Sequence, residues 1–142
     1  MPLLLVRHAS AGDRTTWEGD DRERPLDDRG RRDADELVDL LASFDVQAIL
    51  TSPYRRCVET VAPLARARGL EIDAREELGE ALQGEHGAAL VRSLAGQDVV
   101  VCGHGGLDWV VPGAPKWKKG AVFVLGPELE LLEILRPRRG AG

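Results

Sequence analysis

Short apolar runs alternate along the chain with segments in which apolar residues recur every three or four positions. The short runs are typical of buried strands, and the three-and-four spacing is typical of helices that pack one face on a core. The pattern predicts strands at residues 2–7, 46–53, 70–74, 98–104, 121–126 and 128–135. It predicts helices from Asp27 or Asp28 through Phe44, at 54–69 and at 86–95.

Capping residues support the first two predicted helices. Asp27 or Asp28 is placed to cap the start of the first helix, and Gly69 is placed to end the second. Pro63 falls inside the second helix and is a candidate kink. The apolar face of the first helix is expected to be Ala34, Leu37, Val38, Leu41 and Phe44. The corresponding face of the second is expected to be Val58, Val61, Ala62 and Ala65.

The alternation of strands and helices predicts one α/β domain over residues 1–142. In this fold class, three layers are formed by a mostly parallel central sheet with helices on both faces. The last two strands lie close together around Gly126 and Pro127, which favours an antiparallel strand at the C-terminal end. No repeat, low-complexity segment or linker divides the chain.

Composition narrows the classes of partner. The net charge of −5 argues against a general nucleic-acid binder, because such proteins need a basic face. No apolar run approaches the roughly 20 residues of a transmembrane helix, and no basic leader precedes the first strand. We therefore expect a cytoplasmic protein that binds neither nucleic acid nor membrane. Cys57 and Cys102 match no metal-ligand spacing and are expected to be small buried residues. The oligomeric state is not predicted.

Charged residues follow the apolar strands at the points where a ligand would bind. Arg7 and His8 end the first strand, and His104 ends the fourth. Ligands of open α/β sheets bind beyond the carboxyl ends of the strands. Arg55 and Arg56 open the helix after the second strand, and free amides at a helix N-terminus favour an anion. Two histidines and several guanidinium groups are thus expected at one edge of the sheet.

These residue types suit phosphoryl transfer without a metal or other cofactor. A neutral imidazole can attack phosphorus directly, and the planar fork of arginine donates paired hydrogen bonds to phosphate oxygens. Other enzyme classes lack their signatures, because no serine lies in a G-x-S-x-G elbow and no phosphate-binding loop of P-loop kinases is present. His86 is expected to be structural. A phosphate-binding module without catalysis is the remaining alternative.

Three segments, taken in their order along the chain, resemble motifs of the histidine phosphatase superfamily, the group of phosphoglycerate-mutase-like and acid-phosphatase-like enzymes. They are "LVRHASAGD" (5–13), "TSPYRRCVET" (51–60) and "VVVCGHGG" (99–106), and "RPLDDRGRRDA" (24–34) resembles the start of the family's first helix. The short chain is most similar to SixA-like phosphohistidine phosphatases. Residues 6–27 are also similar to the histidine-phosphatase half of bacterial Nudix fusion proteins, which act on nucleotides.

The resemblance implies a role for each matching residue. His8 would be transiently phosphorylated, and Arg7, Arg56 and His104 would bind the phosphoryl group. The family's L-x-E pattern matches Glu80, which would protonate the leaving group, with Glu77 and Glu85 as alternatives. Water would then hydrolyse the phosphohistidine. The implied substrates are phosphomonoesters or phosphoramidates: a phosphohistidine-bearing protein, or a small molecule such as a nucleotide or sugar phosphate.

Three positions depart from the family pattern. Ala9 replaces glycine after the histidine, and Cys57 and Glu59 replace the usual alanine and glutamine. Glu59 adds a negative charge one turn from Arg56 and is expected to lower phosphate affinity. Basic residues outside the motifs are candidates for contacting a larger anionic substrate, namely Arg14, Arg22, Lys116 and Lys119.

Overall fold

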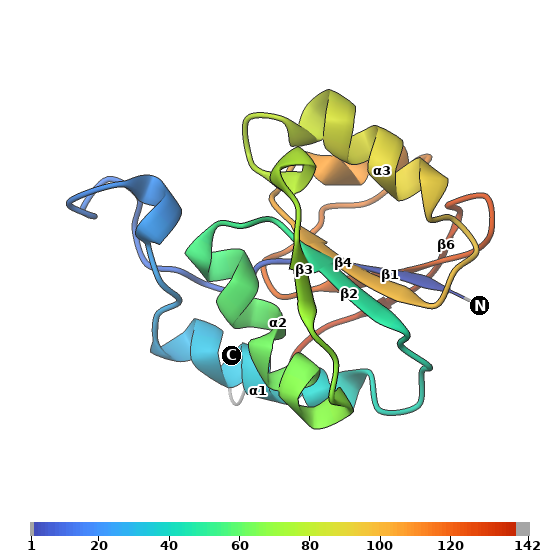
Figure 1. Cartoon of the computed structure of the whole chain (residues 1–142), viewed down its shortest axis with the longest axis horizontal. Helices are drawn as coiled ribbons and strands as arrows, with labels where there is room; N and C mark the ends of the chain where they lie inside the picture. The colour runs from blue at the N-terminus through green and yellow to red at the C-terminus, as the bar shows by residue number, and fades with distance from the viewer. Residues whose placement is uncertain (1, 139–142) are drawn as a thin grey trace.

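Six strands form one sheet in the order β3-β2-β4-β1-β5-β6 (Figure 1). The computed structural model describes residues 2–138. The strands are β1 (Leu3–Arg7), β2 (Ala48–Thr51), β3 (Ile72–Ala74), β4 (Val99–Gly103), β5 (Val122–Leu125) and β6 (Leu131–Leu135). Every predicted strand is confirmed and is shorter than predicted, because only its inner residues pair with a neighbour.

The strand pairing confirms the predicted sheet. Strand β1 pairs parallel with β4, and β2 pairs parallel with both β4 and β3. The direction reverses at β5, which runs antiparallel to β1 and to β6. As a result, the start of β5 and the end of β6 lie at the same sheet edge as the carboxyl end of β1.

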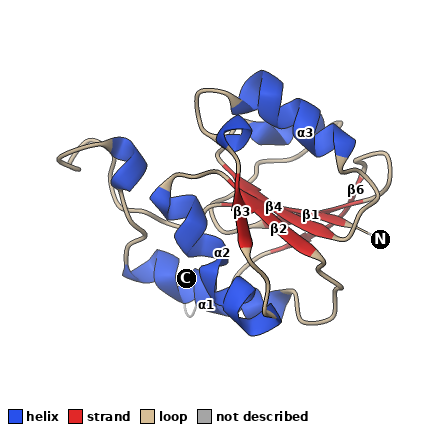
Figure 2. Cartoon of the chain, viewed as in Figure 1, coloured by secondary structure: helices blue, strands red, loops and turns tan. Residues whose placement is uncertain are grey.

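Helices cover both faces of the sheet, as predicted (Figure 2). Helices α1 (Asp28–Leu40) and α2 (Arg55–Arg68) lie on one face, and α3 (Ala88–Ser93) lies on the other. The shorter helical turns are Asp21–Glu23, Glu76–Leu78, Gln83–Gly87 and Leu107–Val110. The three-layer α/β architecture predicted from the sequence is therefore confirmed.

Successive side chains of β1 point to opposite faces of the sheet and contribute to the hydrophobic core on each face. Leu3 and Leu5 pack with Val91 of α3, while Leu4 and Val6 pack with Val61 of α2 on the opposite face. The four apolar side chains of β1 are fully buried. Each contributes about 1.5–3 kcal/mol of hydrophobic stabilisation, so the strand that carries the site is anchored on both faces.

The first helix begins where the sequence indicates. Asp27 caps it by accepting a hydrogen bond from Gly30 N at 2.8 Å. Gly30 is required, because a Cβ at this position would lie 2.0 Å from the carbonyl oxygen of Ser10. The helix is thereby packed directly against the loop that follows His8.

The first helix ends earlier than predicted, at Leu40 instead of Phe44.

Two other helix predictions need correction. The buried face of α2 comprises Arg56, Cys57, Thr60, Val61, Leu64 and Ala65, whereas Val58 and Ala62 are only half-buried. The face is rotated by one position because the charged Arg56 is drawn inside. Pro63 lies within α2 without ending it. The third helix is shorter than predicted and follows a π-helical turn at Gln83–Gly87, where a Cβ on Gly87 would lie 2.8 Å from Glu77 O.

The two cysteines and the lengths of the helices bear on two further predictions. Cys57 and Cys102 are both buried free thiols, as predicted. No helix in the part of the chain that the structure describes is long and apolar enough to cross a membrane.

Candidate active site

His8 directly follows β1, a strand that is paired on both sides. Its backbone N donates to Gly103 O at 3.1 Å, which continues the β1–β4 pairing. From the other side, Gly120 N donates to both Arg7 O and His8 O, at 3.1 and 3.2 Å. The backbone that carries the imidazole is therefore fixed from both sides.

The imidazole of His8 is buried and held in one tautomer. Its Nδ1 lies 2.8 Å from Ala9 O, and because a carbonyl only accepts, Nδ1 carries the proton and Nε2 keeps its lone pair. Burial lowers the pKa of His8 to about 3. The hydrogen bond to the Ala9 carbonyl acts in the opposite direction, and electrostatic repulsion from His104, Arg56 and Arg7 lowers the pKa further. His8 is therefore neutral at physiological pH.

His104 faces His8 from the neighbouring strand. Its ring is 1% exposed, its Nε2 lies 2.9 Å from Ser52 Oγ, and its backbone N donates to Gln83 Oε1 at 3.1 Å. The ring of Tyr54 packs edge-on against it, with centroids 4.7 Å apart. The Nδ1 atom lies 3.5 Å from Glu80 Oε2, longer than an ordinary hydrogen bond.

Two arginines flank the histidines. Arg7 Nη1 donates to Trp117 O at 2.8 Å, which ties its guanidinium to the segment before β5. Arg56 is fully buried, and its Nη1 and Nη2 donate to the backbone oxygen and the carboxylate of Asp21 at 2.8 and 3.0 Å. Arg56 Nη2 also donates to Glu80 Oε2 at 3.2 Å.

Three buried nitrogens around His8 have no hydrogen-bond partner in the described part of the chain. They are Arg7 Nε, Arg56 Nε and His104 Nδ1. A buried polar group without a partner costs about 1–3 kcal/mol, so such groups are rare and call for an explanation. All three come from different segments, and Arg7, Arg56 and His104 each act electrostatically on the His8 imidazole, so an oxyanion is the ligand that they fit.

Glu80 is the predicted acid that reaches this site. Arg14 Nη2 donates to its two carboxylate oxygens at 2.9 and 2.8 Å. Glu80 lines a cavity of about 540 Å³ together with His8, Arg7 and Arg14. The two alternative glutamates do not line this cavity: Glu77 lies 3.8 Å from Arg75, and Glu85 is exposed.

Glu59 is bound to other partners than Arg56, and its expected effect on phosphate affinity stays a prediction. Glu59 accepts hydrogen bonds from Leu26 N at 2.9 Å and from Arg55 Nε at 2.8 Å, and no contact with Arg56 is present among the described residues. The helix turn directs the carboxylate away from the buried guanidinium and toward the start of α1. Glu59 therefore holds the chain at Leu26.

The remaining basic candidates separate into two groups. Arg14 lines the cavity of His8, Lys116 lines a neighbouring cavity, and Lys119 lines both. Arg22 lies outside both cavities, donates to Glu76 and stacks on Tyr54 with its Cζ 4.9 Å from the ring centroid. His86 is exposed and lines neither cavity.

Sequence reasoning missed three residues that organise the site. Ser52 and Gln83 hold His104, as described above, and Ser52 lies inside a recognised motif. Asp21 binds both Arg56 and Arg24. Burial alone would raise the pKa of Asp21, but these guanidinium groups hold it below its ordinary value. Asp21 lies in a long polar loop, so no periodicity marks it in the sequence.

No group of three or more His, Cys, Asp or Glu side chains among the described residues could hold a metal ion. The predicted independence of metals stays a prediction.

Comparison with protein families identifies the class to which this fold and site belong. Residues 3–88 match the model of the histidine phosphatase superfamily (branch 1). The chain therefore belongs to this superfamily, and the expected enzyme class, a phosphatase, is confirmed at the level of the family.

Individual relatives extend the comparison. The chain is 39% identical over 120 residues to an 8-oxo-(d)GTP phosphatase of Mycolicibacterium smegmatis, a match that covers 81% of this chain and 36% of the relative. The chain thus spans about a third of the length of that relative.

Solved structures show the same fold. The protein histidine phosphatase SixA, in complex with tungstate, superposes with a TM-score of 0.79 at 19% identity over 96% of this chain and 97% of SixA. A SixA from Agrobacterium tumefaciens superposes with a TM-score of 0.76 at 25% identity over 96% and 97% of the two chains. The predicted similarity to SixA is confirmed.

Proposed function

We propose that this chain is a metal-independent phosphatase that passes a phosphoryl group through His8. The observation that carries the proposal is the set of three buried, unpartnered nitrogens around an imidazole whose Nε2 keeps its lone pair. Arg7, Arg56 and His104 bind the phosphoryl oxygens. Charge spread over these oxygens in the transition state is stabilised by donors already in place.

The reaction proceeds in two balanced steps. His8 Nε2 forms a bond to phosphorus while the bond to the leaving group breaks, and Glu80 in its protonated form gives its proton to the leaving atom. Water then attacks the phosphohistidine, Glu80 takes a proton from it, and phosphate is released with His8 restored.

Binding of the phosphoryl group changes the partners of one arginine. Arg56 Nη2 donates to Glu80 Oε2 at 3.2 Å, and a phosphate oxygen would compete for the same N–H. Substrate binding therefore releases Glu80 from Arg56, while Arg14 still donates to its two carboxylate oxygens and holds it beside the leaving atom. Asp21 continues to hold the guanidinium from behind.

Two substrate classes are supported by different observations. The SixA neighbours support a phosphohistidine-bearing protein. The relative named 8-oxo-(d)GTP phosphatase, at 39% identity, supports a nucleotide. Assays of the purified protein with a phosphohistidine protein, 8-oxo-dGTP, GTP and p-nitrophenyl phosphate would distinguish the two substrate classes.

We also propose that the enzyme is cytoplasmic, and the buried free thiols of Cys57 and Cys102 agree with that location.

Trapping of the intermediate tests the mechanism. Brief incubation with radiolabelled substrate and a quench in base, where phosphohistidine survives, should leave label on His8. His8→Asn should abolish both label and turnover, while His86→Asn, at an exposed position, should retain both. Binding of phosphate without label or turnover would instead identify the non-catalytic module.

A further inference from the structure

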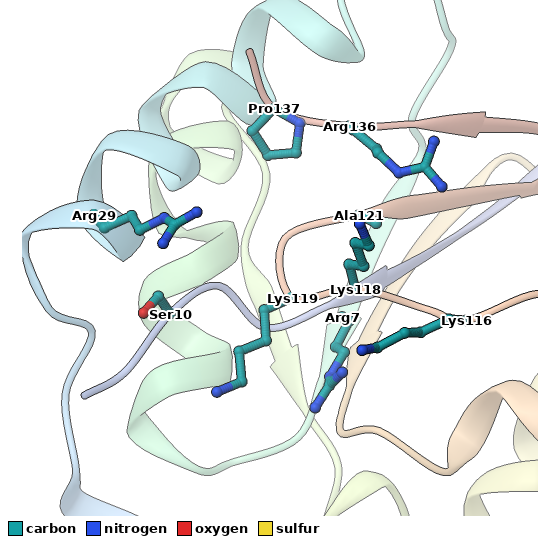
Figure 3. Close-up of a pocket in the computed structure, with 9 residues that line it drawn as sticks. All are labelled: Arg7, Ser10, Arg29, Lys116, Lys118, Lys119, Ala121, Arg136 and Pro137. Atoms are coloured by element: carbon teal, nitrogen blue, oxygen red, sulfur yellow. The ribbon is translucent and has the colours of Figure 1, made fainter. Parts of the chain in front are cut away.

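A second cavity adjoins that of His8 and is strongly basic (Figure 3). It has a volume of about 610 Å³, and Arg7 and Lys119 line both cavities. Six of its lining residues are cationic and none is acidic: Arg7, Arg29, Lys116, Lys118, Lys119 and Arg136. This basic hollow is unexpected in a chain with a net charge of −5.

The reversed direction of β5 explains how these cations meet. Lys116, Lys118 and Lys119 precede β5, and Arg136 directly follows β6. Because β5 runs antiparallel to both β1 and β6, its start and the end of β6 lie beside the end of β1. Arg29 is added from the first turn of α1, across the hollow from Arg7 (Figure 3).

Trp117 anchors the segment that carries the three lysines, residues 116–119. Trp117 is 2% exposed, and its Nε1 donates to Ala121 O at 3.2 Å. Its own carbonyl accepts from Arg7 Nη1 at 2.8 Å. The exposed lysines on either side are therefore held at fixed backbone positions next to the phosphoryl site, and Figure 3 shows Lys116 and Lys119 on opposite sides of Arg7.

Cations that line the two cavities act on one another at Lys119. Burial and then the positive charges of Arg7 and Arg24 lower the pKa of Lys119, with Asp27 acting in the opposite direction. The carboxylate of Asp27 is itself bound by Ser10 Oγ, Gly12 N and Gly30 N, at 2.6, 3.0 and 2.8 Å. An additional anion beside Arg7 and Lys119 would relieve the repulsion among these cations.

We propose that the basic hollow is a second anion subsite, which binds the phosphate groups next to the transferred one in a phosphoanhydride chain, as in a nucleoside diphosphate or triphosphate. The inference rests on the proposed function, because the terminal phosphoryl group must occupy the site of His8. Successive phosphates share one bridging oxygen, so the next phosphate of such a substrate lies beside the residues shared by the two cavities. The concave shape fits a compact polyanion better than the flat acidic surface of a partner protein.

Binding of inorganic phosphates tests this subsite without catalysis. We would titrate the His8→Asn variant with orthophosphate, pyrophosphate and tripolyphosphate in a calorimeter. Tripolyphosphate should bind at least about tenfold more tightly than orthophosphate, because it reaches additional cations. This preference should weaken as salt screens the exposed charges.

A matched pair of variants locates the preference. In the His8→Asn background, Lys118→Gln/Arg136→Gln should remove most of the tripolyphosphate preference, about tenfold, while orthophosphate binding changes little. Arg66→Gln/Arg92→Gln removes the same charge from α2 and α3, outside both cavities, and should retain the preference. Thermal unfolding would verify that each variant is folded, with Lys116→Gln/Lys118→Gln as a replacement if the first pair is not.

Two results would overturn the subsite: tripolyphosphate binding no more tightly than orthophosphate, or equal losses in both pairs of variants. Failure of the proposed function has a different signature, because the titration needs no turnover. Loss of the label on His8 would refute the phosphatase mechanism, whatever the titration shows.

Discussion

The imidazole rings of His8 and His104 lie edge to face, with centroids 5.5 Å apart and ring planes inclined by 66°. The two residues follow neighbouring parallel strands, in which Arg7 is paired with Gly103. Main-chain hydrogen bonds therefore set the separation of the rings. In the proposed mechanism, a phosphoryl group placed between them meets a nucleophile and a hydrogen-bond donor whose positions are fixed before it binds.

The lowered pKa of His8 predicts a loss of stability in acid. Between pH 6.5 and about 3, an unfolded chain binds a proton on His8 that the folded chain does not, so stability falls as pH falls. Between pH 7.5 and 5 this group alone should cost about 2 kcal/mol. Urea unfolding at the two pH values should show a smaller loss for His8→Asn than for the wild type. An unchanged loss in His8→Asn would contradict the buried neutral imidazole; His86→Asn is the control.

Glu80 should matter in proportion to the basicity of the leaving group. Alkoxides need a proton in the transition state, whereas nitrophenolate scarcely does. Glu80→Gln should therefore slow turnover of alkyl phosphates by about 10²–10⁴-fold and that of p-nitrophenyl phosphate much less. Glu77→Gln, outside the cavity, should slow neither. Equal losses on both substrates would make Glu80 a positioning residue instead.

A methyl group at position 105 should disturb Arg7. A Cβ there would lie 3.0 Å from Arg7 Cζ and Nη2, so the guanidinium would have to shift while still bonded to Trp117 O. Gly105→Ala should lower kcat/KM by about tenfold or more, because small misplacements of binding groups are costly. Gly84→Ala provides the control, since its Cβ would meet nothing within 4 Å. The prediction fails if the two alanine variants are equally active.

Metal removal should leave turnover unchanged. Arg7, Arg56 and His104 are expected to supply the charge stabilisation that a divalent ion supplies in many phosphatases. Rates measured with excess EDTA and with added magnesium or zinc should agree. A strict requirement for either ion would exclude the mechanism proposed for His8.

The sequence could predict what depends on local pattern. Apolar runs that end in His8 and His104 place both residues at the sheet edge, because parallel strands end there together. The burial of Arg56 could not be predicted from the pattern, since its partner Asp21 lies in a loop without periodicity. The basic hollow could not be predicted from the sequence either, because Lys118 and Arg136 come to line one cavity only through the antiparallel pairing of β5 and β6.

The central position of β1 divides the site into a constant and an exchangeable part. Strand β1 is paired on both sides, and its four apolar residues are fully buried, so any change near His8 is transmitted to both cores. Arg14, Asp21 and Glu80, by contrast, come from loops and short turns that leave the sheet. Substrate preference could therefore be redesigned by grafting residues 12–19 from another member of the superfamily, with Asp21 retained because it holds Arg56.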